Sequence, residues 1–372
     1  MEKSPINLAS FLPLVFLLCI SWTQEIEIKT EDGVTVVYNP KRPVRLPGVP
    51  STIILKEDLI IGEKTEKEDY WFSALNSIAV DNSGNIYTLD PKDIKIRVFD
   101  PMGLLLRTFG RKGQGPGEFS GPGSLRIMAD GNLVVGDILK RTFTYLTLDG
   151  KHLKTVSTSK LPVGLVRIDS GGFVYQYKRG RGYKAVDELI KYDPNLNPIM
   201  KFHSFERTRK SRVINPYTVG FLFDITKDDN LIWLLSSAYD IHVVDPRGKT
   251  IRRIVKDNDP IKITNADKDR YTKEASSQMP SVRLRIEFPD YYPVSSRLFI
   301  DDRDQIYIRT YEKDAQGGVY HDVFDPEGRY IVRFTLPENE QVVVIKNNKL
   351  YCMIRENEEG IPVVKRYTIG WK

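Results

Sequence analysis

DNSGNIYTLDPKDIKIRVFDPMGLLLRTFG, residues 81–110, contains two polar turns, each of which follows or precedes a short apolar strand. Asp, Asn and Gly tolerate positive φ and close tight hairpins, whereas β-branched and aromatic residues pack well on a pleated surface. Together with the preceding LNSIAV, this stretch supplies four strands in order. One small sheet cannot bury both of its faces, so the pattern predicts that similar sheets pack against it.

The same pattern recurs along the chain. Six copies of the first turn and its strand begin at Asp81, Ala129, Asp169, Lys227, Asp302 and Asn347, and five of them are followed by a second turn such as FDPMG or VDPRG. A repeat with two hairpin turns, spaced by roughly forty to fifty residues where nothing is inserted, is typical of a propeller blade. The sequence therefore predicts an all-β fold, a six-bladed β-propeller with four-stranded antiparallel blades.

The last blade lacks a strand within the C-terminal sequence. After residue 340 the chain offers only QVVVIK, KLYCMI and VVKRYTIG. We expect the segment Ser51–Lys64 (STIILKEDLIIGEK) to supply the fourth strand, because closing the ring with strands from both termini removes an open edge.

Three further segments have a predicted place in the domain organisation. Residues 1–23 form a leader, residues 24–50 form a separate small hairpin and a proline-rich connector, and residues 51–372 form the ring. Residues 256–293 interrupt the repeat, with Asn265 as the expected N-cap of a short helix. Insertions in repeat folds map to loops, which are often the binding face.

The leader indicates a location outside the cytoplasm: periplasmic, secreted or at the cell surface. Lys3 precedes an apolar run from Leu8 to Ile20, which has the length of a secretory signal core rather than of a membrane span. Cleavage after Ser21 is one expectation, and a lipoprotein signal with lipid on Cys19 is the alternative. Once the leader is removed, Cys352 is the remaining cysteine, so no internal disulfide forms and Cys352 is expected to be a small buried apolar residue.

The loop TFGRKGQGPGEFSGPGSL (108–125) resembles the link between blades in NHL-repeat propellers and in the bacterial secreted six-bladed propellers related to them. The matching positions are Phe109, Gly110, Gly113, Gly117, Phe119 and Pro122. The resemblance extends over the ring from Ile53 to Gly370. It implies the propeller fold and, for function, a recognition platform for proteins or nucleic acid, with a few relatives that are enzymes.

Strand parity separates two faces of the predicted ring. In a four-stranded antiparallel blade, the turn from strand two to three and the crossing to the next blade emerge on one face, here called the loop face. Basic residues gather in these segments although the formal net charge is only +6. We expect them to attract an anionic partner, with solvated surface charge as the alternative. The set is Arg111, Lys112, Lys140, Arg141, Lys178, Arg179, Arg181, Lys184, Arg207, Arg209, Lys210 and Arg212.

Within this set Arg179, Arg181, Arg209 and Arg212 are the strongest candidates, because they flank one blade and Arg binds carboxylate, sulfate or phosphate in a forked geometry. Lys210, Arg111 and Lys112 complete the predicted binding residues. Tyr291 and Tyr292, near Phe288, are candidates for stacking on a sugar or peptide, although such clusters more often pack an insertion onto its own ring.

No catalytic or cofactor motif stands out. The inner strands are expected to enter the axial channel with mostly hydroxyl or apolar groups, such as Ser124 and Ser295, which offer a divalent cation few ligands. The four histidines have no metal-ligand spacing, and no Gly-x-Ser-x-Gly elbow appears. We therefore expect no metal, no cofactor and no catalytic residues.

The leading hypothesis is an exported, non-enzymatic recognition propeller whose partner is an envelope or extracellular protein or an anionic glycan. The alternative is a propeller lyase or hydrolase that acts on a carbohydrate or lactone. Nucleic acid fits the basic loops but is rarely met by an exported domain, and a membrane would be involved only through a lipid anchor at Cys19.

Overall fold

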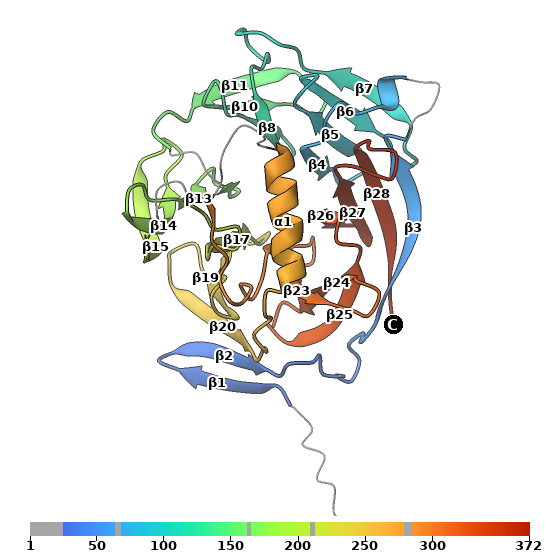
Figure 1. The fold of residues 1–372 in the computed structure, drawn as a ribbon. Coiled ribbons are helices and arrows are strands. Elements are labelled where there is room, and N and C mark those ends of the chain that lie inside the picture. Colours follow the sequence, from blue (N-terminus) through green and yellow to red (C-terminus); the bar gives the residue numbers. More distant parts are fainter. Residues whose placement is uncertain (1–24, 64–67, 162–164, 209–212, 279–284) are drawn as a thin grey trace, which may run out of the picture.

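The computed structural model describes residues 25–63, 68–161, 165–208, 213–278 and 285–372. These residues form six sheets arranged as blades around one centre, and each blade contains four antiparallel strands (Figure 1). The predicted all-β, six-bladed propeller is confirmed. The first strands of blades 6 and 1, 1 and 2, 3 and 4, and 4 and 5 contact one another, so the inner strands lie towards the axis of the ring.

Blades 1, 2, 3 and 5 each consist of four consecutive strands. Blade 1 contains β4 (Ser77–Val80), β5 (Ile86–Asp90), β6 (Lys95–Phe99) and β7 (Leu105–Phe109), and blade 2 contains β8 (Pro122–Ile127), β9 (Leu133–Asp137), β10 (Thr142–Leu146) and β11 (His152–Ser157). Blade 3 contains β12 (Val166–Ile168), β13 (Val174–Lys178), β14 (Lys184–Tyr192) and β15 (Pro198–Thr208), and blade 5 contains β22 (Arg297–Ile300), β23 (Ile306–Lys313), β24 (Val319–Phe324) and β25 (Tyr330–Leu336).

Blade 6 joins the two ends of the ring, as predicted. Its strands β26 (Gln341–Lys346), β27 (Lys349–Ile354) and β28 (Val363–Trp371) are completed by β3 (Ile53–Ile61) from the N-terminal side. The antiparallel pairing of β3 with β28 runs from Ile61 opposite Val364 to Ile53 opposite Trp371, with one bulge. Strands from both termini thus remove the open edge that three C-terminal strands alone would leave.

Blade 4 has six strands rather than four. Its four consecutive strands are β17 (Phe221–Ile225), β18 (Leu231–Leu235), β19 (Asp240–Val244) and β20 (Thr250–Lys256). The N-terminal strand β2 (Val34–Asn39) pairs with β20 in parallel, and β1 (Glu27–Glu31) then pairs with β2. The expected N-terminal hairpin forms, but it is not separate from the ring. Val36 and Val37 are fully buried on it, and Asn39 exchanges hydrogen bonds with the main chain at Gly328 and Tyr330 of blade 5. Burial of these apolar side chains is the physical reason why the hairpin docks.

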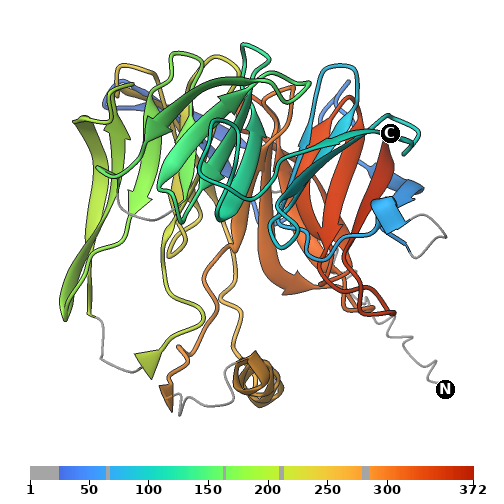
Figure 2. The same ribbon diagram turned by 90° about the horizontal axis from the view of Figure 1, so that it is seen from above.

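The insertion after blade 4 forms α1 (Asn265–Gln278) and the short strand β21 (Arg285–Ile286), which pairs in parallel with β16 (Val213–Ile214) from the crossing between blades 3 and 4. α1 lies across the middle of the ring in Figure 1 and below the blades in Figure 2. Its N-cap is Thr264, so the prediction of Asn265 was wrong by one residue. The Thr264 hydroxyl accepts a hydrogen bond from the Asp267 N–H at 3.2 Å, and the Asp267 carboxylate accepts one from the Thr264 N–H at 3.0 Å. This reciprocal arrangement satisfies two N–H groups that a helix start leaves unpaired.

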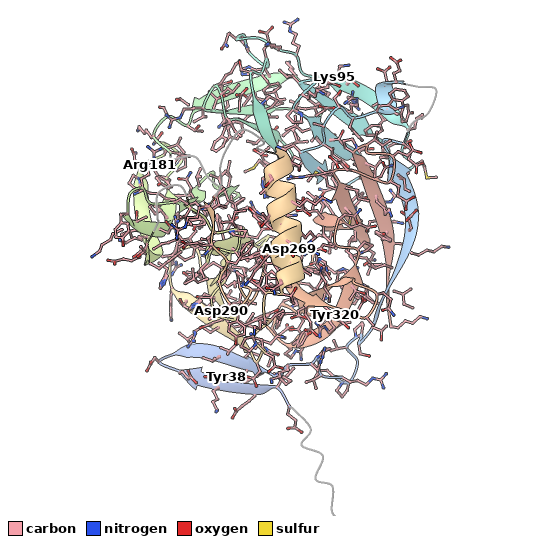
Figure 3. The ribbon with its side chains drawn as sticks, in the orientation of Figure 1. Tyr38, Lys95, Arg181, Asp269, Asp290 and Tyr320 are labelled. Atoms are coloured by element: carbon pink, nitrogen blue, oxygen red, sulfur yellow. The ribbon has the colours of Figure 1, made fainter. Side chains whose placement is uncertain are left out.

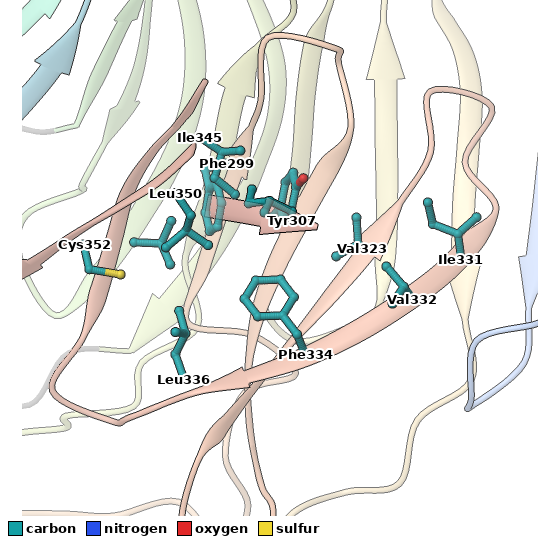
Figure 4. Close-up of a cluster of buried hydrophobic side chains, with 12 residues drawn as sticks. Phe299, Tyr307, Val323, Ile331, Val332, Phe334, Leu336, Ile345, Leu350 and Cys352 are labelled. Carbon is teal, nitrogen blue, oxygen red and sulfur yellow. The ribbon is translucent and has the colours of Figure 1, made fainter. Parts of the chain in front are cut away.

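The core consists of apolar layers between adjacent blades. One cluster between blades 5 and 6 includes Phe299, Tyr307, Phe334 and Leu350, with Cys352 at its edge (Figure 4). Cys352 is fully buried, as expected, and burial raises the pKa of its thiol. Within the described part of the chain, no helix has the length and apolar character needed to cross a membrane.

Candidate binding sites on the loop face and in the axial cavity

In blades 1 and 2, an aspartate at the end of the second strand connects the segments of the loop face. Asp90 accepts hydrogen bonds from the main-chain N–H groups of Ser73 and Ala74 in the crossing before β4 and from Lys92 and Asp93 in the turn after β5. Crossings and second-to-third-strand turns therefore meet on one face, as strand parity predicts.

Blade 2 repeats this arrangement. Asp137 accepts from Ser120 and Gly121 in the crossing and from Lys140 in the turn. Asp90 and Asp137 were not predicted as anchors, although the strand endings IYTLD and LVVGD contain them.

The opposite face consists of tight turns whose aspartates serve the fold. Asp81, Asp169 and Asp301 are buried, and each accepts a hydrogen bond from the main-chain N–H four residues later. Each also accepts one from a tyrosine hydroxyl two residues beyond that, at 3.4, 3.2 and 3.0 Å respectively. These carboxylates are occupied by the turns themselves.

Several of the predicted basic residues are already paired with carboxylates. Arg207 makes two hydrogen bonds to the buried Asp187, at 3.2 and 3.1 Å. Lys178 contacts Glu188 at 2.8 Å, and Arg111 contacts Glu118 at 2.8 Å. Acidic residues on adjacent strands and in the same loop therefore offset part of the positive charge, which the sequence analysis did not anticipate.

The exposed positive charge of blade 3 is concentrated in the turn between β13 and β14. Arg179 and Arg181 are exposed, and neither forms an ion pair with a residue that the structure describes. The Arg179 guanidinium lies 5.4 Å from the centre of the Tyr177 ring, while Tyr183 in the same turn is 66% exposed. Figure 3 shows Arg181 at the outer edge of the ring, far from Asp269 of α1 over the centre. Lys112 is exposed in the crossing between blades 1 and 2, whereas Arg209, Lys210 and Arg212 lie outside the described residues.

The aromatic residues of the insertion pack within the fold. Tyr292 stacks on Tyr311 of β23 at 4.5 Å and contacts the Tyr217 ring edge-to-face at 4.6 Å. Tyr271 of α1 and Phe288 complete the cluster. It attaches α1 to the ring, the more common role of such clusters. Tyr291 is 52% exposed beside it.

A cavity of about 540 Å³ lies along the axis, where the inner strands of blades 6, 1, 2 and 3 approach one another. Its wall contains hydroxyl and apolar groups, as expected for the inner strands, among them Ser77, Ser124, Val80, Ile168 and Val344.

It also contains charged groups that sequence reasoning missed. Arg126 of β8 and Arg167 of β12 line the cavity, and Arg297 of β22 is close enough to interact electrostatically with both. No motif surrounds these arginines, and only the equivalent places of Arg126 and Arg167 in blades 2 and 3 could have indicated two of them.

The three arginines differ in their partners. Arg167 donates to Asp224 of β17 at 2.6 Å, and Arg297 donates to the Val342 carbonyl at 2.9 Å. Arg126 forms no hydrogen bond or ion pair with any residue in the described ranges. Partial desolvation by the cavity wall and the positive charge of Arg167 lower the pKa of Arg126 to about 10, so the guanidinium stays protonated at neutral pH.

None of the described residues suggests a metal centre: no three His, Cys, Asp or Glu side chains are grouped to hold a metal ion. The buried His321 stacks on Phe334, and burial lowers its pKa to about 3, so it serves as an uncharged packing residue.

Comparison with known proteins supports the fold. The model of a family described as a 6-bladed β-propeller, DUF5128, matches residues 65–338. A Bacteroides fragilis protein proposed to be exported superimposes with a TM-score of 0.52 at 12% identity, covering 91% of this chain and 99% of that one. A member of the DUF4221 family from Bacteroides vulgatus has the same TM-score and identity, covering 87% and 100%.

A streptogramin B lyase superimposes less closely, with a TM-score of 0.43 at 11% identity over 84% of this chain and 97% of the lyase. A search of the curated proteins finds no match. These likenesses concern the fold and carry no residue roles.

Proposed function

The chain belongs to the DUF5128 family of 6-bladed β-propellers, and we propose that it is an exported recognition module that binds an anionic glycan through the blade 3 turn of its loop face. Export is supported by the leader pattern, in which Lys3 precedes the apolar run Leu8–Ile20.

The observation that carries the proposal is the chemistry of the turn between β13 and β14. Arg179 and Arg181 present exposed guanidinium groups without acidic partners among the described residues, and Lys184 is exposed at the start of β14. Tyr183 offers an exposed ring between them. Guanidinium groups fork onto carboxylate or sulfate, and an adjacent aromatic face packs against a sugar ring. This combination suits a polymer of acidic sugars.

The test measures binding to alginate, a polyuronate, and to dextran sulfate, with neutral dextran as the control polymer. It uses the mature chain, which means the chain without the predicted leader, residues 1–23. We expect binding to both anionic polymers and a loss of affinity between 50 and 500 mM salt, because exposed charges are screened within about 8 Å at physiological ionic strength. The double variant Arg179→Glu/Arg181→Glu should bind at least about tenfold more weakly, equivalent to about 1.4 kcal/mol.

A matched control reverses the same number of charges on the opposite face. Arg247 and Lys249 are exposed in the turn between β19 and β20. The variant Arg247→Glu/Lys249→Glu should retain binding within about twofold, since it alters net charge equally without touching the loop face. Equal weakening by both double variants would mean that net charge, not this turn, attracts the polymer. Absence of binding to either anionic polymer would refute the glycan partner.

A further inference from the structure

We propose that the axial cavity is a separate binding site for a small organic carboxylate, whose charged group is bound by Arg126 and whose apolar part lies against the inner strands of blades 1 to 3. This inference is independent of the loop-face proposal. The residues involved are different, and Arg181 lies at the outer edge of the ring (Figure 3).

The register of the inner strands places charged side chains of three blades at the same depth. Arg126, Arg167 and Asp224 each occupy the penultimate paired position of an inner strand, opposite Val134, Tyr175 and Ile232 respectively. Equivalent positions of successive blades lie at the same depth in a propeller, because the blades are related by rotation about the axis. Blades 2, 3 and 4 therefore place two arginines and one aspartate at one level of the axis.

Two arginines therefore share a single aspartate at this level of the axis. Asp224 pairs with Arg167 through a 2.6 Å contact, and this leaves Arg126 without a carboxylate partner among the residues that the structure describes. The other charged groups of the cavity wall are also occupied. Asp137 accepts three main-chain N–H groups, and Arg141 donates to the carbonyls of Ser159 and Leu161.

Arg126 lines this cavity on β8, and its side chain is exposed rather than packed in the protein core. A guanidinium carries five N–H donors in a fixed fork, and this fork matches the two oxygens of a carboxylate that enters the cavity.

The rest of the cavity offers an apolar surface. Its wall is largely apolar, with Ile78, Val80, Ile127, Val166 and Val343 around the axis. A volume of about 540 Å³ falls within the range of small-ligand sites, about 300–1,000 Å³.

On the loop-face side, the exposed side chains of Ile138 and Leu165 also line the cavity, with 59% and 45% of their surface accessible. One cation in an apolar chamber with an apolar rim matches a molecule with a carboxylate at one end and a hydrocarbon or aromatic body. Phosphate alone would leave the apolar wall unused.

The experiment measures binding of 4-phenylbutyrate and octanoate to the mature chain by calorimetry, with 4-phenylbutanol as the uncharged analogue and inorganic phosphate as the anion without an apolar body. We expect each carboxylate to bind at least tenfold more tightly than 4-phenylbutanol and than phosphate. Arg126→Gln, which keeps much of the side-chain length and removes the charge, should abolish the preference for carboxylate over alcohol.

Two further variants keep the result interpretable. Arg303→Gln removes an exposed arginine from a turn on the opposite face and should leave all affinities unchanged. Ile138→Glu places a negative charge at the exposed rim, where folding tolerates it, and should weaken carboxylate binding at least fivefold while leaving 4-phenylbutanol within about threefold. It replaces Arg126→Gln as the test if that variant does not fold.

The proposal is overturned if neither carboxylate binds the wild-type chain, if phosphate binds as tightly as the carboxylates, or if Arg126→Gln folds and keeps the preference for carboxylate. Because Arg179 and Arg181 are intact in all these variants, a negative result here leaves glycan binding by the loop face unaffected.

Discussion

Replacing Asp58 by Asn should lower the free energy of unfolding by about 2 kcal/mol at pH 7 and by much less in acid. Asp58 is the extra residue in the bulge of β3 where it pairs with β28. Its carboxylate accepts hydrogen bonds from Arg366 Nε at 2.7 Å, from the Thr368 hydroxyl at 2.6 Å and from Lys349. Arg366 also donates to the Pro101 carbonyl of blade 1 at 2.7 Å. This one carboxylate therefore connects the N-terminal strand, the C-terminal strand and the first blade.

The size of the expected loss in unfolding free energy follows from the ionisation of Asp58. Burial by itself would raise the pKa of this carboxyl, but the hydrogen bonds from Arg366, Lys349 and Thr368 outweigh it and lower the pKa from 3.8 to about 2. Almost two pKa units correspond to about 2 kcal/mol. Because the folded-state pKa is the lower one, this stabilisation is complete well above pH 3.8 and is lost as the pH falls towards 2. Roughly half of it remains at pH 3.

The assay is urea unfolding of the mature wild type and of Asp58→Asn at pH 7, 5 and 3. Glu57→Gln is the matched control, since Glu57 is the adjacent residue, is itself exposed and, among the described residues, forms only an ion pair with Lys365 at 3.3 Å. It should cost less than about 1 kcal/mol at every pH. A loss for Asp58→Asn that is below about 0.5 kcal/mol at pH 7, or that is the same at pH 7 and pH 3, would refute the assigned role of this carboxylate.

Three other predictions concern the N-terminal hairpin, the inserted helix and export. Asn39→Ala should lower the free energy of unfolding by about 2–3 kcal/mol, because it leaves the buried N–H of Tyr330 without its 2.7 Å acceptor; an unchanged urea midpoint would contradict this. Thr264→Ala should destabilise α1 by about 1 kcal/mol through loss of the N-cap, seen as faster amide exchange in α1 with unchanged exchange in the blades; equal exchange in α1 would contradict it. Protein purified from its native host should begin within Trp22–Glu25 or carry lipid on Cys19, as intact mass would show, and a retained Met1 would contradict export.

The residues that build each blade could be identified without the tertiary structure. Asp81 and Asp169 begin turns that close within four residues, and the strands that follow pair with their immediate neighbours in the sequence. Because a hairpin depends on local turn chemistry and alternation, the turn residues and the side chains beside them specify it. Closure of blade 6 was predictable for a related reason, since only three C-terminal strands remain and Ser51–Lys64 has the missing pattern.

The candidate sites were less predictable, because charge pairing depends on side-chain direction and on neighbouring strands. Arg207 belonged to the predicted basic surface, yet its charge is neutralised by Asp187 on the adjacent strand β14. Arg179 and Arg181 remain exposed in the turn where strand parity placed them. The sequence identified Asp81 and Asp169 as turn residues, and only the structure shows that their carboxylates are buried hydrogen-bond acceptors.

The sequence by itself determined the number of blades, the order of their strands, the two faces of the ring and its closure, since all of these depend on short-range turns repeated along the chain. Only the tertiary structure decided that β1 and β2 dock on blade 4, more than 200 residues away, and that α1 lies over the centre of the loop face. It alone brought Arg126, Arg167 and Asp224 from three blades to one depth of the axial cavity. The physical reason is that these arrangements result from packing between segments distant in sequence, whose partners no local pattern specifies.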